Sequence, residues 1–203
     1  MKYYTSTGPN PRVVTLFMAE RGVAPEVVKV DLRNAENRGP AFVAKNPSGT
    51  LPALELDDGT VLAEVIAICE YLDEVTPGPS LIGGTALERA ETRMWTRRID
   101  LNIAENLVNG FRFSDGLSIF QDRMRCIPEA ASGLKLLTQE KIAWLDGLMA
   151  GRTWICGERF TLADIFLFAF LEFGAKIGQH FDASLGWIPG WYERMTARVS
   201  GAR

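Results

Sequence analysis

The sequence predicts a small α/β domain followed by an all-helical domain. Short β-like and helical segments alternate over the first 75 residues, whereas no convincing strand follows them. Between the two parts, residues 76–80 (TPGPS) interrupt every regular pattern, because proline and glycine end helices and strands alike. We therefore expect domains over residues 1–76 and 87–203, joined by a linker over 77–86.

The first domain is predicted to begin with a strand over residues 2–5 and a helix after the turn-rich stretch that follows. Asn10 and Pro11 suit the N-cap and the first helical position, because asparagine caps well and proline needs no donor there. Gly22 is expected to end this helix.

β-Branched residues and turn signals predict the rest of this domain. Residues 26–30 are strand-like, and one helical turn is expected around residues 40–45. Residues 52–56 and 60–62 form a hairpin signal, because Asp-Asp-Gly lies between them. A helix over residues 64–74 closes the domain. The order is strand, helix, strand, short helix, hairpin, helix.

The second domain is predicted to contain four helices, over residues 86–110, 130–149, 161–176 and 189–199. Large apolar residues recur at helical spacing in the second of these. The third has a sharp start, because Thr161 and Asp164 have the spacing of a capping box.

Charge and composition exclude several classes of protein. With 22 basic and 25 acidic residues, the chain lacks the basic character typical of a nucleic-acid module. Its most apolar run, 165–171, is far shorter than the roughly 20 residues that span a bilayer. One histidine and three widely spaced cysteines favour neither a metal site nor a disulfide framework. No membrane or nucleic-acid partner is therefore expected, and free thiols without an export signal indicate a cytoplasmic protein.

Three motifs in this order resemble those of the cytosolic glutathione transferase superfamily. They are residues 46–52 (NPSGTLP), 62–72 (LAEVIAICEYL) and 160–164 (FTLAD). Residues 8–14 (GPNPRVV) further resemble bacterial and fungal members with a P-N turn at the first helix. The resemblance implies a thioredoxin-like domain that binds glutathione as cosubstrate and a helical domain that holds the electrophile. It also implies a homodimer with a role in detoxification.

A transferase of this kind must favour the thiolate of glutathione, because a cysteine thiol with a pKa of about 8.5 is mostly protonated at neutral pH. In the resembled family, a residue of the turn before the first helix contacts the sulfur. The candidates here are Ser6 and Asn10, in that order, although turn formation explains Ser6 and plain helix capping explains Asn10 equally well. Capping and sulfur contact would compete for the one amide of Asn10. The N-terminus of the helix adds a positive dipole end.

The resemblance assigns the remaining glutathione contacts. A cis bond between Leu51 and Pro52 would present the backbone of Leu51 to the cysteinyl part of glutathione. Glu64 would accept from the γ-glutamyl amine, and Lys45 would reach the glycyl carboxylate. Val65 departs from the family pattern, which has serine there. Losing a hydrogen bond to a charged group costs about 1.5–3 kcal/mol, so glutathione binding is expected to weaken unless another group substitutes.

The electrophile pocket is expected near the end of the first long helix of the second domain, at Phe111, Arg112 and Phe113, although aromatic residues there equally suit a core. The resulting hypothesis is an enzyme that conjugates glutathione to an apolar electrophile, without a metal. Two alternatives stay open: a glutathione-dependent disulfide reductase or peroxidase, and a non-catalytic binding or stress protein on the same scaffold.

Overall fold

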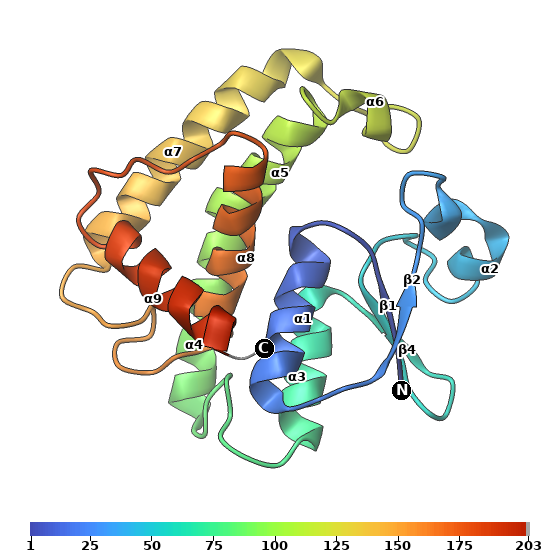
Figure 1. The fold of residues 1–203 in the computed structure, drawn as a ribbon, viewed down its shortest axis with the longest axis horizontal. Helices are drawn as coiled ribbons and strands as arrows, with labels where there is room; N and C mark the ends of the chain where they lie inside the picture. The colour runs from blue at the N-terminus through green and yellow to red at the C-terminus, as the bar shows by residue number, and fades with distance from the viewer. Residues whose placement is uncertain (202–203) are drawn as a thin grey trace. The chain divides into compact units, whose positions relative to one another are not determined.

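The computed structural model describes residues 1–201 and consists of two compact units, divided after Leu81 (Figure 1). The first unit mixes strands and helices, and the second is built from helices. This is the predicted fold class. No helix within residues 1–201 combines the length and apolar character needed to cross a membrane.

The first unit follows the predicted order of elements. These are β1 (Lys2–Thr5), α1 (Pro9–Arg21), β2 (Glu26–Lys29), the 3₁₀ turn η1 (Glu36–Arg38), α2 (Pro40–Val43), β3 (Ala53–Glu55), β4 (Val61–Ala63) and α3 (Val65–Val75). Gly22 ends α1 in the left-handed conformation, as predicted.

The four strands form one mixed sheet in the order β2-β1-β3-β4, with β1 and β2 parallel and the other pairs antiparallel. Successive side chains point to opposite faces of a strand. Tyr3 is buried towards α1, where its hydroxyl donates to the carbonyl oxygen of Pro11 over 2.7 Å, whereas Tyr4 packs edgewise on Phe42 of α2. The sheet therefore has α1 and α3 on one face and α2 on the other (Figure 1).

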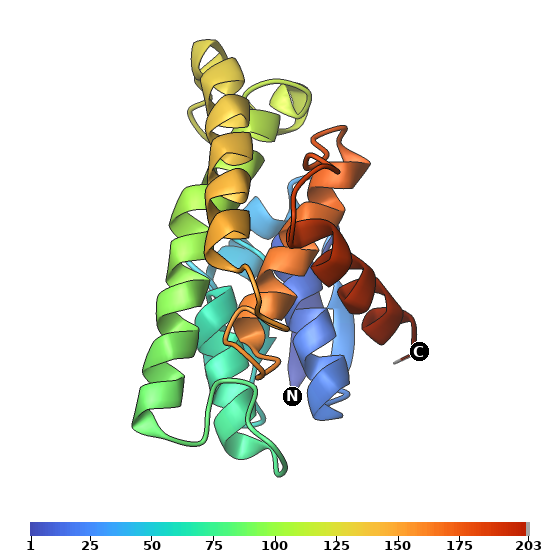
Figure 2. The same cartoon turned by 90° about the vertical axis from the view of Figure 1, so that its left-hand side faces the viewer.

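The second unit contains more helical segments than the sequence predicts. These are α4 (Ala86–Ile99), the π-helical turn η2 (Asp100–Ala104), α5 (Glu105–Arg112), α6 (Leu117–Phe120), the 3₁₀ turn η3 (Pro128–Ala130), α7 (Ala131–Leu148), α8 (Leu162–Lys176) and α9 (Ile188–Gly201). Figure 2 shows α7 running alongside α5, and α4 packs against α8.

Helix α8 is the core of the second unit. Every residue from Leu162 to Leu171 is buried, which is typical of a helix surrounded by others. Its start is the predicted capping box, because the Asp164 carboxylate accepts from the backbone N–H of Thr161 over 3.0 Å. Asp164 also accepts from the indole N–H of Trp191 on α9, so one buried carboxylate joins the two helices.

Two predictions about helix geometry are wrong. Asn10 is not the N-cap of α1: Gly8 takes that position, Pro9 begins the helix and Asn10 lies inside its first turn. The predicted continuous helix over 86–110 is interrupted by η2, where the N–H of Glu105 bonds to the carbonyl of Asp100 five residues earlier.

Candidate functional site

The sheet register brings three of the predicted glutathione segments to the same end of strands β1, β3 and β4. Tyr4 of β1 is paired with Ala53 of β3, which in turn is paired with Ala63 of β4. Pro52 precedes this row on β3 and Glu64 follows it on β4, whereas Ser6 lies two residues beyond Tyr4, just past the end of β1. Neighbouring strands lie about 4.8 Å apart, so the row is roughly 10 Å wide. An extended tripeptide has about that length.

The first turn of α1 is unusually poor in backbone donors. Pro9 and Pro11 have no N–H group, and the N–H of Arg12 bonds to the carbonyl of Gly8 over 3.3 Å. Asn10 therefore carries the free N–H of this turn. Its side chain does not cap the helix. The competition between capping and sulfur contact, expected from the sequence, is therefore absent, and neither the amide nor the N–H of Asn10 is used in capping the helix.

Gly8 and Tyr3 fix the position of that turn. Gly8 has φ 133°, a backbone conformation that residues with a side chain rarely adopt. Tyr3 joins β1 to α1 through its bond to Pro11, and Thr15 donates to the same carbonyl over 3.0 Å. Ser6 is half-buried, and its hydroxyl donates locally to the carbonyl of Thr7 over 3.3 Å. The hydroxyl is thus held in the turn by one weak bond.

The loop before β3 is rigidly held by asparagine side chains. Asn46 is buried; its amide donates to the carbonyl of Thr50 over 2.9 Å, and its oxygen accepts from the Ser48 hydroxyl over 2.8 Å. Asn37, also buried, donates to the carbonyl of Gly49 over 2.6 Å. A β-carbon at Gly49 would lie 2.9 Å from the carbonyl oxygen of Asn37, so this close approach needs glycine. The Leu51–Pro52 bond that follows is cis, as predicted.

Helix α3 begins without a side-chain cap. Glu64 occupies its N-cap position, yet its exposed side chain makes no capping hydrogen bond and its backbone has φ 70°. A positive φ in a residue with a side chain costs of order 1–3 kcal/mol and is concentrated at functional sites. The first backbone bond of the helix joins the N–H of Ile68 to the carbonyl of Glu64, which leaves the N–H groups of residues 65–67 free of helical partners. The Val65 side chain is buried, 8% exposed.

Lys45 lies apart from this row of residues. Its ammonium nitrogen is 2.6 Å from Oε2 of Glu55, and the Tyr4 hydroxyl donates to the same oxygen over 2.7 Å. The Lys45 bond lowers the pKa of Glu55, and Glu55 in turn raises the pKa of Lys45. The structure thus places Lys45 in an ion pair with Glu55, the last residue of β3.

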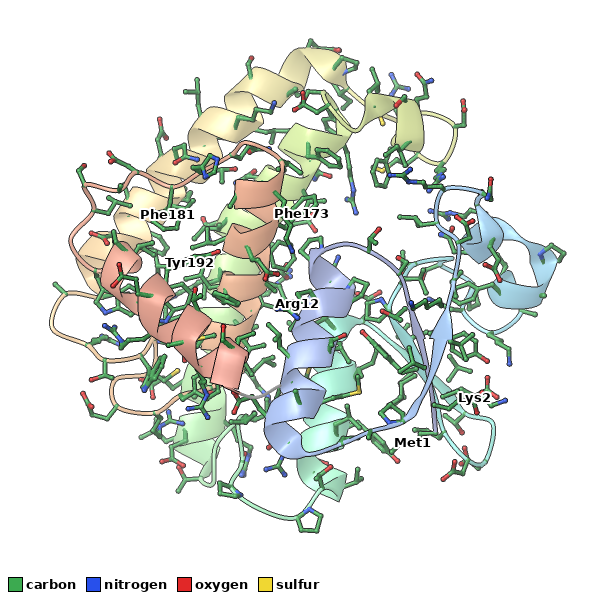
Figure 3. The ribbon with its side chains drawn as sticks, in the orientation of Figure 1. Met1, Lys2, Arg12, Phe173, Phe181 and Tyr192 are labelled. Atoms are coloured by element: carbon green, nitrogen blue, oxygen red, sulfur yellow. The ribbon has the colours of Figure 1, made fainter. Side chains whose placement is uncertain are left out.

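The three residues predicted for the electrophile pocket differ in their surroundings. Phe113 is buried, 9% exposed. Phe111 is half-buried and packs edgewise on Phe120 of α6 and Phe173 of α8, the latter labelled in Figure 3. The Arg112 guanidinium donates to the side-chain oxygen of Asn109 over 3.1 Å. Burial lowers the pKa of Arg112.

The cysteines do not join this site. Cys69 and Cys156 are buried, and burial raises the pKa of both thiols, that of Cys69 well above its usual range. Cys126 is half-buried and bonds weakly to the carbonyl of Met124. Residues 1–201 contain no group of three or more histidine, cysteine or acidic side chains arranged to hold a metal ion.

Sequence reasoning missed the residues that position the candidate groups. Tyr3 anchors the first turn of α1, Asn109 orients Arg112, and Glu55 engages Lys45. The position of Tyr3, two residues before the end of β1, was a usable signal. The other two contacts depend on how the chain folds.

Comparisons with known proteins match both units. The sequence profile of the glutathione S-transferase N-terminal domain matches residues 7–75, and that of the C-terminal domain matches residues 134–198. Glutathione S-transferase 2 of Saccharomyces cerevisiae is 33% identical over 98% of this chain and 86% of its own length. A glutathione S-transferase domain-containing protein of Marinobacter aquaeolei is 35% identical, with a TM-score of 0.90 over 98% of both chains. Gtt2 of Saccharomyces cerevisiae is 31% identical, with a TM-score of 0.92 over the whole of both chains.

Proposed function

Because the chain belongs to the glutathione S-transferase family, we propose that it binds glutathione, favours its thiolate and conjugates it to an apolar electrophile held by the helical unit. The observation that carries this proposal is the sheet register, which brings Pro52, Glu64 and the end of β1 before Ser6 to the same end of the strands. In this proposal the donors for sulfur lie beside β1, and the acid lies beside the free N-terminus of α3.

At the α3 end, Glu64 accepts from the γ-glutamyl ammonium, and the free N–H groups of residues 65–67 donate to the neighbouring carboxylate. Val65 keeps its backbone donor although its side chain is buried, so the carboxylate is still bound, but without the additional hydrogen bond that a serine hydroxyl would supply. Leu51 pairs through its backbone with the cysteinyl residue in the manner of a strand edge. Lys45 reaches the glycyl carboxylate only by leaving Glu55.

At the α1 end, the amide and backbone N–H of Asn10 and the hydroxyl of Ser6 donate to the sulfur. The positive end of the α1 dipole adds to their effect. The donor-poor first turn makes Asn10 the larger contributor, which reverses the order expected from the sequence. The enzyme supplies no nucleophile of its own: the thiol proton leaves to solvent, and the thiolate attacks the electrophile and displaces its leaving group.

Calorimetric titration with glutathione tests the binding step. We expect saturable heat at millimolar glutathione or below. If neither heat nor a thermal shift is observed at that concentration, every glutathione-dependent function is excluded. That result would favour a non-catalytic scaffold, which the valine at position 65 would then explain.

The pH dependence of bound thiolate absorbance assigns the activating group. We expect Asn10→Ala to raise the pKa of bound glutathione by about 1–2 units, because a hydrogen bond to a charged group contributes about 1.5–3 kcal/mol. Ser6→Ala should produce a smaller rise. Thr7→Ala is the matched control, because Thr7 is an exposed neighbour in the same turn, and it should leave that pKa unchanged. An unchanged pKa in both Asn10→Ala and Ser6→Ala would exclude these residues as activators.

A second candidate is a glutathione-dependent disulfide reductase or peroxidase. The turn over residues 6–8 contains neither cysteine nor tyrosine, so no protein thiol lies in that turn to exchange with glutathione. Turnover of a small mixed disulfide measured beside an aryl halide separates the two reactions. The transferase proposal requires the aryl halide to be the better substrate.

The remaining proposals rest on membership of the family. We expect a homodimer, located in the cytoplasm and acting in detoxification. Sedimentation equilibrium at micromolar protein should give twice the chain mass of 22.5 kDa.

A further inference from the structure

The end of α5 carries a guanidinium that no carboxylate among residues 1–201 neutralises directly. Nη1 of Arg112 donates to Oδ1 of Asn109 over 3.1 Å, and Nδ2 of Asn109 donates to Oε2 of Glu105 over 3.2 Å. Nε of Arg112 is buried and has no hydrogen-bond partner within the described residues. A buried donor without a partner is destabilising, so this arrangement is poorly explained by stability.

The geometry of the Arg112 guanidinium indicates which kind of group it can bind. Because Nη1 is used by Asn109, Nε and Nη2 form the edge of the guanidinium that has no hydrogen-bond partner among the described residues. Two parallel N–H donors of this kind match the two oxygens of a carboxylate. Glu105 holds Asn109, and Asn109 holds Arg112, so the fork is oriented before any ligand arrives.

An aromatic ring lies beside the same guanidinium and belongs to a larger aromatic cluster. Its central carbon is 5.4 Å from the centroid of the Phe120 ring, and the guanidinium of Arg123 is 5.9 Å from that ring. Phe111 packs edgewise on Phe120 and on Phe173. Two cations beside one ring of an aromatic cluster suit a ligand with an apolar, planar body and one negative charge.

We propose that Arg112 binds a carboxylate on the electrophile, so that the substrates of this enzyme are aromatic electrophiles carrying an acid group. The inference rests on the proposed transferase function and narrows its substrate class. With an aryl chloride as probe, the thiolate sulfur of glutathione forms a bond to the ring carbon. The carbon–chlorine bond breaks and chloride leaves with the electron pair.

The test compares two probes that share ring, nitro group and leaving group: 4-chloro-3-nitrobenzoate and its primary amide. The measured quantity is the ratio of kcat/KM for the acid to kcat/KM for the amide, because differences in intrinsic reactivity cancel between enzyme variants. We expect Arg112→Gln to lower this ratio by about 10- to 150-fold, the range for a lost hydrogen bond to a charged group. The ratio for Arg112→Lys should lie between those of the wild type and Arg112→Gln, because lysine keeps the charge but loses the two parallel N–H donors.

Arg125→Gln is the matched control. Arg125 is an exposed arginine on the segment that follows Arg123, and removing it alters the net charge equally. We expect it to leave the ratio unchanged. An equal fall in Arg112→Gln and Arg125→Gln would overturn the proposal, because it would indicate general attraction of anions. An unchanged ratio in Arg112→Gln would overturn it as well.

A binding measurement separates this inference from the transferase function. 3-Nitrobenzoate and 3-nitrobenzamide cannot react, and calorimetry of the wild type with each requires no variant to fold. We expect the acid to bind at least tenfold more tightly. Preferential binding of the acid without turnover of any aryl chloride would support the Arg112 site and contradict the transferase. Turnover with equal binding of acid and amide would contradict the site alone.

Discussion

The stability of the helical unit should fall as pH rises from about 4 to about 6, because of Asp164. This carboxyl is fully buried and accepts from the backbone N–H groups of Ile155 and Thr161, the Thr161 hydroxyl and the indole N–H of Trp191. Burial outweighs these bonds and raises the pKa of Asp164 from 3.8 to about 6. The folded protein therefore holds a proton on Asp164 over a pH range in which the unfolded chain has lost it.

The size of the effect follows from the two pKa values of Asp164, about 6 folded and 3.8 unfolded. Each pKa unit corresponds to 1.36 kcal/mol, so the group contributes about 3 kcal/mol less to the free energy of unfolding above pH 6 than below pH 4. The sign is fixed by proton uptake: the folded state binds more protons between the two values, so stability falls with pH at up to about 1.4 kcal/mol per unit.

Asp164→Asn isolates this contribution, because the variant keeps the side-chain shape and cannot ionise. Urea denaturation followed by tryptophan fluorescence reports on this unit, since all five tryptophans lie in it. The free energy of unfolding of the wild type minus that of the variant should fall by about 2.4 kcal/mol from pH 4 to pH 7.

Asp182→Asn is the control for the Asp164 titration. A bond from the N–H of Ser184 lowers the pKa of Asp182, so its difference curve should rise with pH instead. A difference curve for Asp164→Asn that is flat or rises with pH would refute the reasoning. It would mean that the hydrogen-bond donors around Asp164 stabilise the carboxylate more than burial destabilises it.

Two further substitutions test the ends of helices. Val65→Ser should tighten glutathione binding by about 10-fold or more in a calorimetric titration relative to Val65→Ala, because both variants lose the same buried packing and only serine supplies a hydroxyl; equal affinities would contradict a ligand carboxylate at this helix start. Asp146→Ala should lower the free energy of unfolding by about 2–4 kcal/mol in urea, because its carboxylate accepts from the N–H groups of Gly186, Trp187 and Ile188 where α9 begins; a loss below about 0.5 kcal/mol would mean that water replaces these bonds.

Signals that act over a few residues predicted much of the fold. The strand over residues 2–5, the end of α1 at Gly22 and the capping box at Thr161 are confirmed as predicted. Residues 8–11 were ambiguous, because Gly8-Pro9 and Asn10-Pro11 both satisfy the preference for proline in the first turn. The helix uses the earlier pair, since Gly8 can adopt the positive φ that this chain entry requires.

Features that depend on distant contacts could not be predicted. The π-helical turn over Asp100–Ala104 has no marker in the sequence, yet one extra residue rotates everything after it by about 100°. Helical periodicity counted from residue 86 therefore says nothing about the face that carries Arg112. Lys45 and Glu55 lie ten residues apart across a loop, so their pairing depends on where the folded chain places that loop.

The central claim is that the proposed glutathione contacts lie together at one end of strands β1, β3 and β4. A crystal structure with bound glutathione tests this claim most directly. We predict the γ-glutamyl carboxylate at the start of α3, the ammonium beside Glu64, and the sulfur within hydrogen-bond distance of Asn10. Glutathione bound away from this end of the strands, or with its sulfur beyond reach of both Asn10 and Ser6, would contradict the proposed site.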